Sequence, residues 1–461
     1  MAKNKKKRIK HSKPKVEVIS SPFPTWLTNS RLHKWMLFAF AFLLYANTLT
    51  HDYTQDDAIV IYDNMFTTKG FEGIPGILKY DTFYGFFKTE GKAKLVAGGR
   101  YRPLTLVMFA AEVGLFGHSP FVGHLVSVLL YGLLGVVLYI VLLKLFKYKE
   151  SVPYPTIIAF ITALLFIAHP VHTEVVANIK GRDEIVTLLG SLAALLFSLK
   201  AFKQQSFIWN IIAGVIFFLA LLAKENAITF LAIIPLSYFV FTDAKLGKIA
   251  MQTLPFVIAA GIFLVIRGAV LGGNFDGSTS MELMNNPFLK IEGNRWVAFS
   301  FSEKMATITY TLGKYLQLLV VPHPLTHDYY PRHVDLMSWG NWKVLLSVIA
   351  HVGLGIYALL GLLKKKPISY AILFYLITLT IVSNVVFPIG TNMAERFIFM
   401  PSVGFCLAIG ILLAQLYKKT SMMLPLAIVG GIALLFSIKT ITRNFVWKDN
   451  FTLFTLSLIH I

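Results

Sequence analysis

The sequence has little charge and almost no cysteine. Only 14% of its 461 residues are charged, whereas 56% are hydrophobic. A water-soluble domain needs far more charge to cover its surface, so the composition excludes a soluble globular protein. The single cysteine, Cys406, cannot form an internal disulfide, and its apolar neighbours favour a small helix residue with a packing role.

Long apolar runs take the place of the missing charge. They recur along the whole chain, and many approach the roughly 20 residues that a helix needs to cross a bilayer. The sequence therefore predicts an all-α polytopic membrane protein, with the lipid bilayer as its first partner.

Acidic residues are scarce as well, with 23 Asp and Glu against 43 Lys and Arg and a net charge of +20. The basic residues cluster in MAKNKKKRIKHSKPK and beside apolar segments, which is the pattern that sets membrane orientation. We expect no nucleic-acid partner. Residues 1–30 are expected to form a cytoplasmic tail that touches anionic lipids, because its basic region is too long for a cleavable signal peptide.

Orientation follows if the lysine-rich N-terminus is cytoplasmic and the short inner turns are basic. This rule predicts about eleven spans in a membrane domain over 31–445, with residues 446–461 outside. The expected spans are about 33–50, 121–146, 155–173, 185–199, 207–223, the run before TDAKLGK, 250–271, 341–363, 368–387, 397–416 and 422–440.

Two outer regions accompany these spans. A long first outer loop is expected over about 51–120, with a surface helix in PLTLVMFAAEVGLFG that starts at Pro103. A second outer segment covers about 273–340. Residues 303–321 are expected to form a helix that does not cross, because crossing would leave the lysines at 364–366 outside.

Acidic residues contribute little to this assignment, yet nearly all of them fall on the outer side. Two adjacent carboxylates, Asp56 and Asp57 in LTHDYTQDD, follow the first span directly. Adjacent side chains point in different directions, so one of them is expected to face a site. A solvated loop carboxylate is the alternative. The polar chemistry is therefore expected at the outer face.

Cations and further acids stand at the outer ends of other segments. Arg100 and Arg102 in GGRYRPL precede a helix start, which suits either an anion site or lipid head-group anchoring. Lys224-Glu225 ends one span and Glu395-Arg396 begins another. Such charges are costly in a membrane unless they face a cavity or a partner, although each pair could be a structural ion pair.

The stretch HPVHTEVVANIKGRDE adds a third polar group at the same face. His169, His172 and Glu174 could ligate a metal, but Pro170 interrupts the helix and the spacing is not the HExxH pattern. The polar wall of a cavity is the favoured interpretation. We commit to no metal, since arginine and lysine can serve a phosphate leaving group.

A lipid-borne sugar phosphate would use such a face. A carboxylate would accept the proton of an attacking hydroxyl, and cations would stabilise the departing phosphate. A transporter, with polar groups near the middle of the bilayer, and a structural membrane protein are the competing classes.

The motifs in combination resemble the GT-C membrane glycosyltransferases, and most closely the transmembrane and tetratricopeptide-repeat O-mannosyltransferase family. They occur in the order DDAIVIYDN (56–64), YRPLTLVMF (101–109), FGHSPFVGHLVSVLLY (116–131), HPVHTEVVANIKGRDEI (169–185), LLAKENAIT (221–229), NNPF (285–288) and FPIGTNMAERFIFMPSVGFC (387–406).

The resemblance implies a GT-C-type bundle and an inverting transfer of a sugar, with mannose favoured, from a polyprenyl-phosphate carrier to a protein Ser or Thr. A lipid or glycan acceptor is the alternative. It implies a catalytic base at Asp57 or Asp56, with Asp57 preferred. The expected phosphate-binding residues are Arg100, Arg102, Lys224 and Arg396. The expected cavity and substrate-positioning residues are Asn64, Tyr101, His169, His172, Glu174, Arg182, Asp183, Glu225 and Glu395.

In the family, a tetratricopeptide array follows the membrane domain on the outer side. No 34-residue repeat is visible here, and residues 446–461 are where such an array would begin. The interpretations left open are a truncated chain and a member without the array. Lys- and Ile-rich composition favours a bacterial inner membrane over the endoplasmic reticulum, with the active site on the non-cytoplasmic side.

Overall fold

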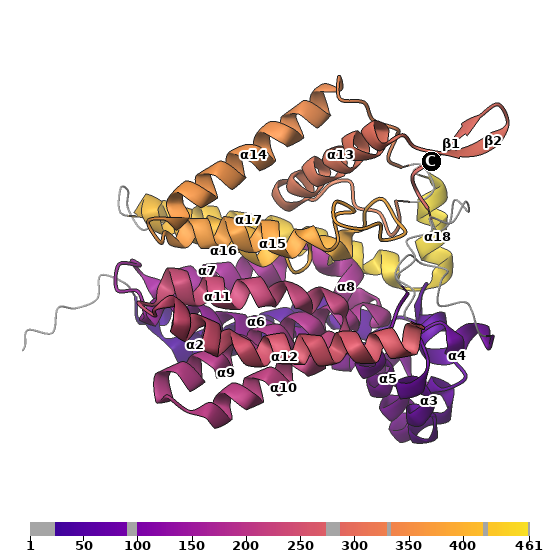
Figure 1. Ribbon diagram of the computed structural model, residues 1–461, viewed down its shortest axis with the longest axis horizontal. Coiled ribbons are helices and arrows are strands. Elements are labelled where there is room, and N and C mark those ends of the chain that lie inside the picture. The colour runs from indigo at the N-terminus through magenta and orange to yellow at the C-terminus, as the bar shows by residue number, and fades with distance from the viewer. Residues whose placement is uncertain (1–23, 90–98, 273–285, 330–332, 418–422, 460–461) are drawn as a thin grey trace, which may run out of the picture.

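The computed structural model describes residues 24–89, 99–272, 286–329, 333–417 and 423–459. Most of the basic tail predicted over 1–30 lies outside these ranges. Within them the chain is largely helical, with one small β-hairpin (Figure 1). Long helices run side by side along the longest axis of the molecule.

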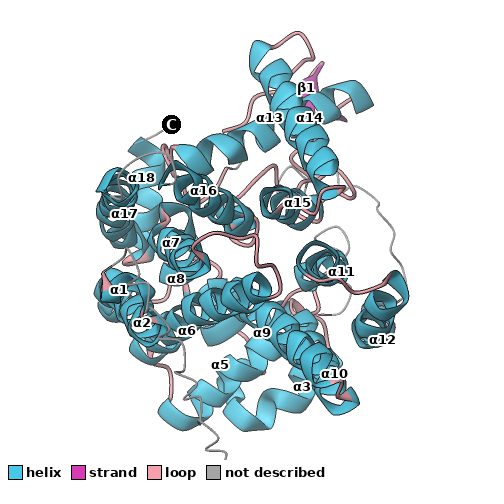
Figure 2. Cartoon of the chain, turned by 90° about the vertical axis from the view of Figure 1, so that its left-hand side faces the viewer, coloured by secondary structure: helices cyan, strands magenta, loops and turns pink. Residues whose placement is uncertain are grey.

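Each predicted span overlaps one of the bundle helices, although the helix ends differ from the predicted bounds. Their bounds are α2 (Ser30–Tyr45), α6 (Pro120–Lys147), α7 (Pro155–Ala168), α9 (Arg182–Gln204), α10 (Phe207–Ala223), α11 (Phe230–Phe241), α12 (Leu246–Leu271), α14 (Trp342–Leu362), α15 (Pro367–Thr380), α16 (Ser402–Tyr417) and α17 (Met423–Asn444). Seen from one end, α10, α11 and α12 lie on one side of the bundle and α2 and α17 on the other, with α6 and α9 between them (Figure 2).

A strict test of helix length and hydropathy gives fewer membrane crossings than the sequence predicts. Five helical segments among the described residues are long and apolar enough to cross a membrane, and a bent pair over Pro155–Ala168 and Pro170–Ala177 makes a sixth. A multi-pass membrane protein is thus supported, while the prediction of about eleven spans stays unconfirmed.

The shorter apolar helices share a physical cause. α10 ends at Ala223 before the 3-10 turn Glu225–Thr229, and α16 begins after the 3-10 turn Glu395–Ile398. These breaks carry charged residues, and backbone that leaves the helix at membrane depth must line a cavity or be buried in protein. The helices are therefore short where the polar residues gather.

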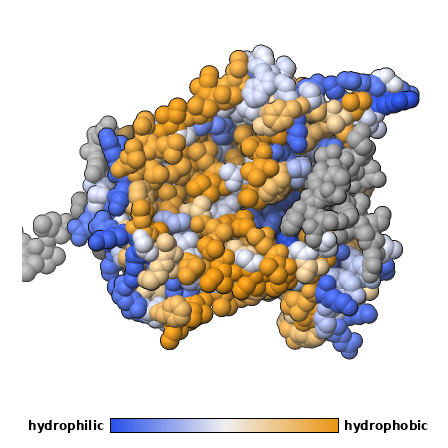
Figure 3. Space-filling model, in the orientation of Figure 1, coloured by the Kyte–Doolittle hydropathy of each residue, from blue (hydrophilic) through white to orange (hydrophobic). Residues whose placement is uncertain are grey.

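The surface fits a lipid environment. Only 22% of the apolar stretch of α12, α14 and α17 is buried, so these helices present apolar side chains outward. In the space-filling view, hydrophobic residues cover much of the middle of this face, while hydrophilic residues gather at its left-hand edge and towards the right (Figure 3).

Several shorter elements lie towards the right-hand side of Figure 1, with α13 nearer its centre. They are α3 (Ile74–Lys79), α4 (Tyr84–Phe87), α5 (Pro103–Phe116), α13 (Phe301–Val320), α18 (Asn450–Ile459) and the antiparallel strands β1 (Leu289–Glu292) and β2 (Arg295–Ala298). The helix predicted from Pro103 and the helix predicted over 303–321 are both present, and α13 fails the test for a span. Their placement against a membrane stays a prediction.

The loop that follows α2 and the C-terminal segment pack together. The backbone N–H of Asp52 donates to the carbonyl of Lys448 at 2.9 Å, and the N–H of Gln55 donates to the side chain of Asn450 at 2.8 Å. Trp447 is fully buried beside them. The C-terminal segment therefore holds the stretch that precedes Asp56 and Asp57.

The predicted sidedness can be tested with exposed positions. We expect single cysteines at Asp63 and Lys448, in a Cys406→Ser background, to react with a membrane-impermeant maleimide from the outer side. Cysteines at Lys203 and Lys364 should react only after permeabilisation, because the basic inner turns define the cytoplasmic face. Labelling of positions 63 and 364 from the same side of sealed vesicles would contradict the topology.

Candidate active site

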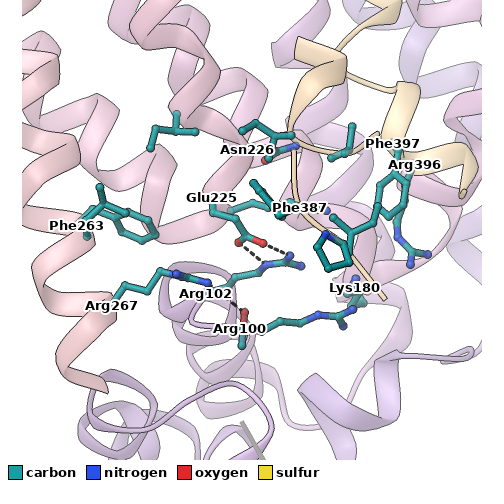
Figure 4. A pocket seen from close by; sticks show the side chains of 18 residues that line it. Arg100, Arg102, Lys180, Glu225, Asn226, Phe263, Arg267, Phe387, Arg396 and Phe397 are labelled. Atoms are coloured by element: carbon teal, nitrogen blue, oxygen red, sulfur yellow. Dashed lines mark hydrogen bonds and ion pairs between the residues drawn. The ribbon is translucent and has the colours of Figure 1, made fainter. Parts of the chain in front are cut away.

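A cavity of about 400 Å³ lies where several helix breaks converge (Figure 4). Six of its lining residues are cationic: Arg100, Arg102, Lys180, Lys224, Arg267 and Arg396. Much of the remaining wall is apolar and comes mainly from the C-terminal half of α12 and from the loop after α15: Ile228, Phe263, Leu264, Ile381, Val382, Phe387, Pro388, Ile389 and Phe397. The cavity is therefore amphiphilic, because cationic and apolar side chains share its wall.

Carboxylates hold several of these cations in place. Arg102 donates to both oxygens of Glu225, at 2.9 and 2.6 Å, and to Asp183 at 3.0 Å. Lys224 lies 3.7 Å from the same Asp183 oxygen and also donates to Glu184. The attraction between these partners offsets part of the desolvation cost that isolated buried ions would incur.

Arg396 is anchored by a different acid. Its guanidinium donates to one oxygen of Glu174, and its backbone N–H donates to the other at 2.9 Å. Glu174 belongs to α8 (Thr173–Ala177), the second half of the bent helix pair. The bend thus brings a carboxylate beneath the turn that carries Arg396.

Arg100 differs from the cations that carboxylates hold in place. Its guanidinium lies 5.3 Å from the centre of the Phe83 ring, and it has no carboxylate within salt-bridge distance among the described residues. An arginine that faces a cavity without a carboxylate partner can accept an anionic ligand.

Asp56 faces a second, much smaller cavity of about 20 Å³. Arg100, Arg102 and Lys180 line both cavities and thus stand between them. Lys180 lies 3.7 Å from Asp56. Burial alone would raise the pKa of Asp56, but the charges of Lys180, Arg396 and Arg100 outweigh it, so the pKa is lowered and the carboxylate is ionised at neutral pH.

Asp57 has different surroundings. Its side chain is fully buried, and each of its oxygens accepts a backbone hydrogen bond, from Thr54 at 2.9 Å and from Lys180 at 2.7 Å. Burial raises its pKa to about 7. Asp57 therefore ties the loop that follows α2 to the turn before α9, and it lines neither of these two cavities.

Lys180 connects these features. Its backbone N–H binds Asp57, and its ammonium group approaches Asp56 at 3.7 Å and Asp183 at 3.8 Å. Sequence reasoning did not select Lys180 or Arg267. Lys180 lies within HPVHTEVVANIKGRDE, and Arg267 is an arginine near the outer end of a long apolar run, which was the available signal for both.

The structure brings together all four of the predicted phosphate-binding residues. It also places Glu225 in the larger cavity and Asp183 in the smaller one, and it sets Glu174 directly behind Arg396. Six other predicted cavity residues line neither cavity: Asn64, Tyr101, His169, His172, Arg182 and Glu395.

Two of these six stabilise the first loop. The side chain of Asn64 accepts from the backbone N–H groups of Phe66 and Thr67 and donates to the carbonyl of Ile59. The hydroxyl of Tyr101 donates to the carbonyl of Leu78 at 2.8 Å. The polar groups of both side chains form hydrogen bonds with the backbone, which explains why they do not face the cavity.

The two histidines are buried with both ring nitrogens engaged. His172 lies between Tyr131 and Ser402, each at 2.9 Å, and His169 contacts the carbonyl of Leu319 at 3.0 Å and the N–H of Val171. These contacts leave no free nitrogen for a ligand.

The remaining two are charged residues with structural contacts. Arg182 donates to Glu112, to the hydroxyl of Ser127 and to the carbonyl of Gly123. Glu395 is fully buried and accepts from the backbone N–H of Thr326 at 2.6 Å. Burial raises the pKa of Glu395 to about 8.

Known proteins with a similar sequence are named as mannosyltransferases. A family model described as dolichyl-phosphate-mannose-protein mannosyltransferase matches residues 102–271, a range that contains Arg102, Lys180, Lys224 and Arg267. The chain is 27% identical to protein O-mannosyl-transferase TMTC4 of Mus musculus over 90% of its length. It is 27% identical to protein O-mannosyl-transferase F38B6.6 of Caenorhabditis elegans and 26% identical to TMTC1 of Homo sapiens, over 92% and 89% of its length.

The resemblance predicted from the sequence is thus confirmed. The chain spans only part of each relative, namely 60% of the first, 57% of the second and 49% of the third.

The role of Asp57 can be tested through stability. We expect Asp57→Asn to lower the free energy of unfolding by about 1–3 kcal/mol, because the amide nitrogen would face one of the two backbone donors and leave a buried group unpaired. The measurement is the unfolding temperature of the purified protein in detergent. Asp63→Asn is the matched control at an exposed position of the same loop, and equal effects of the two substitutions would argue against the anchoring role.

Proposed function

Since this chain resembles the protein O-mannosyl-transferases over about 90% of its length, we propose that it is a glycosyltransferase. In this proposal it moves a sugar, with mannose favoured, from a polyprenyl-phosphate carrier to a hydroxyl of a protein Ser or Thr. The observation that carries the proposal is the amphiphilic cavity, whose cationic wall lies next to an ionised carboxylate.

The donor fits this cavity by its chemistry. A polyprenyl-phosphate sugar is a phosphodiester with one negative charge and a long apolar tail. The cationic wall would bind the phosphate, and the apolar wall of α12 and residues 381–389 would contact the first isoprene units. Arg100 is the principal phosphate ligand in this proposal, because Arg102, Lys224 and Arg396 are already paired with carboxylates.

Asp56 is the proposed base. Its carboxylate takes the proton of the acceptor hydroxyl as the oxygen forms a bond to the anomeric carbon. The bond from that carbon to the phosphate oxygen breaks, and its electron pair leaves with polyprenyl phosphate. Attack from the side opposite the phosphate inverts the configuration at the anomeric carbon.

The cations contribute most as the leaving phosphate gains its second negative charge. Arg100, Arg102 and Lys180 lie between Asp56 and the larger cavity, so they face the phosphate on one side and the base on the other. The small cavity beside Asp56 has room for about one water-sized group, which suits an acceptor hydroxyl.

Asp57 is a positioning residue in this scheme. Sequence reasoning preferred it as the base, but its two oxygens are already occupied by backbone N–H groups. The buried contact orients the turn from which Asp56 projects. The acceptor, the sugar and the membrane in which the enzyme acts remain part of the proposal.

We expect Asp56→Asn to lower the rate of sugar transfer about 10²–10⁴-fold, the range typical of losing a general base. The loss should appear in kcat, with the apparent affinity for donor nearly unchanged. The assay follows consumption of polyprenyl-phosphate mannose by the purified protein with a Ser- and Thr-containing acceptor protein. The matched control is Asp52→Asn, an exposed acid of the same loop, and full activity of Asp56→Asn would exclude Asp56 as the base.

Arg100→Ala should weaken use of the donor more than use of the acceptor. We expect KM for the polyprenyl-phosphate sugar to rise at least about tenfold, because a charge-assisted hydrogen bond contributes about 1.5–3 kcal/mol. Unfolding temperature should change little, since Arg100 has no carboxylate partner among the described residues. Arg295→Ala on β2 is the control, and an unchanged donor KM would remove Arg100 from the phosphate site.

A further inference from the structure

A third cavity, of about 590 Å³, lies between α10 and α12. On α12 it is lined by residues between Lys248 and Ile262, whereas Phe263, Leu264 and Arg267 of the same helix line the cationic cavity. The two cavities therefore lie along successive stretches of α12, and we name the 590 Å³ cavity the α10–α12 groove.

The walls of the α10–α12 groove are apolar and open to the outside. Ile211, Val215 and Ile258 are each about half exposed, with exposed fractions of 47%, 54% and 53%. The two helices meet closely at its floor, where a Cβ on Gly214 would lie 3.0 Å from the Cβ of Pro255. An open apolar groove on a membrane-facing surface suits an acyl chain.

Two amide side chains in the groove have no protein partner. Asn210 and Gln252 are only 5% and 4% exposed, and the carbonyl oxygen of each lacks a hydrogen bond among the described residues. A buried amide without a partner is costly. The oxygen and nitrogen of an amide can exchange places by a simple flip, so each group can donate an N–H to a ligand oxygen.

The mouth of the groove is basic. The ammonium group of Lys248 donates to Gln205, and both residues line the groove. Lys200 lies nearby, with its ammonium 3.1 Å from the centre of the Trp209 ring. The acid of this region, Asp243, is fully exposed and lies 3.8 Å from Lys365. This arrangement favours a negatively charged head group.

We propose that the α10–α12 groove binds one anionic glycerophospholipid. Its phosphate lies at Lys248, its ester oxygens accept hydrogen bonds from the amides of Asn210 and Gln252, and one acyl chain fills the apolar groove. The lipid is distinct from the polyprenyl-phosphate donor, whose phosphate would bind at the other end of α12. The inference does not depend on the proposed catalytic activity.

The test uses the full-length protein purified in detergent and stripped of lipid. Phosphatidylglycerol and phosphatidylcholine with identical acyl chains are titrated, and bound lipid is counted by native mass spectrometry. We expect one phosphatidylglycerol to bind at least about tenfold more tightly than phosphatidylcholine. Lys248→Ala and the double variant Asn210→Leu, Gln252→Leu should each weaken phosphatidylglycerol binding about tenfold.

Matched controls at exposed positions of other helix ends and surfaces are Lys364→Ala and Gln415→Leu, which should bind phosphatidylglycerol like the wild type. Val215→Trp, which would fill the groove with a larger apolar side chain, provides a second variant and should also lose the lipid. Equal binding of the two phospholipids would overturn the proposal. Unchanged phosphatidylglycerol binding in both the folded double variant and Val215→Trp would overturn it as well. Displacement of phosphatidylglycerol by polyprenyl phosphate would instead assign the groove to the donor tail.

Discussion

The cationic cavity depends on the carboxylate of Asp183, which holds three of the cations together. One of its oxygens lies 3.0 Å from Arg102, 3.7 Å from Lys224 and 3.8 Å from Lys180. These three cations come from three separate segments, namely the start of α5, the end of α10 and the turn before α9. Without this shared anion, three positive charges would repel one another in a site with little water to screen them.

Charge compensation also explains the shape of the helices around the cavity. The turns at Glu225–Thr229 and Glu395–Ile398 interrupt what would otherwise be continuous apolar helices. A continuous helix would direct only a fraction of these side chains towards one point. Because each break is stabilised by ion pairs, such as that of Arg396 with Glu174, the bundle can collect cations from distant segments into one space.

The positions of the helices and of the main cations could be predicted from sequence because both follow from the cost of polar groups in a membrane. Arg102, Lys224 and Arg396 stand at ends of apolar runs, where a charge needs a cavity or a partner. The same rule could not distinguish residues that line the cavity from residues that only stabilise the surrounding loops. Asn64 and Tyr101 are polar and near the motif, yet they bind the backbone, and only the fold of the loop shows this.

The order of the two aspartates illustrates the same limit. Alternation along the chain indicates that Asp56 and Asp57 point in different directions, but not which one points into the cavity. The answer lies in the turn before them, where Gln55 adopts a left-handed backbone with φ of 48°. This turn directs Asp57 towards the N–H groups of Thr54 and Lys180 and leaves Asp56 facing the small cavity.

Lys180 then couples the two functions that the proposal assigns to the site. Its backbone fixes Asp57, and so the turn that bears Asp56, while its side chain lines the cavity that would hold the donor phosphate. A phosphate that draws the ammonium of Lys180 towards itself would weaken the contact at 3.7 Å with Asp56. A carboxylate that loses a neighbouring positive charge becomes a stronger base. Donor binding would therefore increase the basicity of Asp56 at the moment when the acceptor hydroxyl must lose its proton.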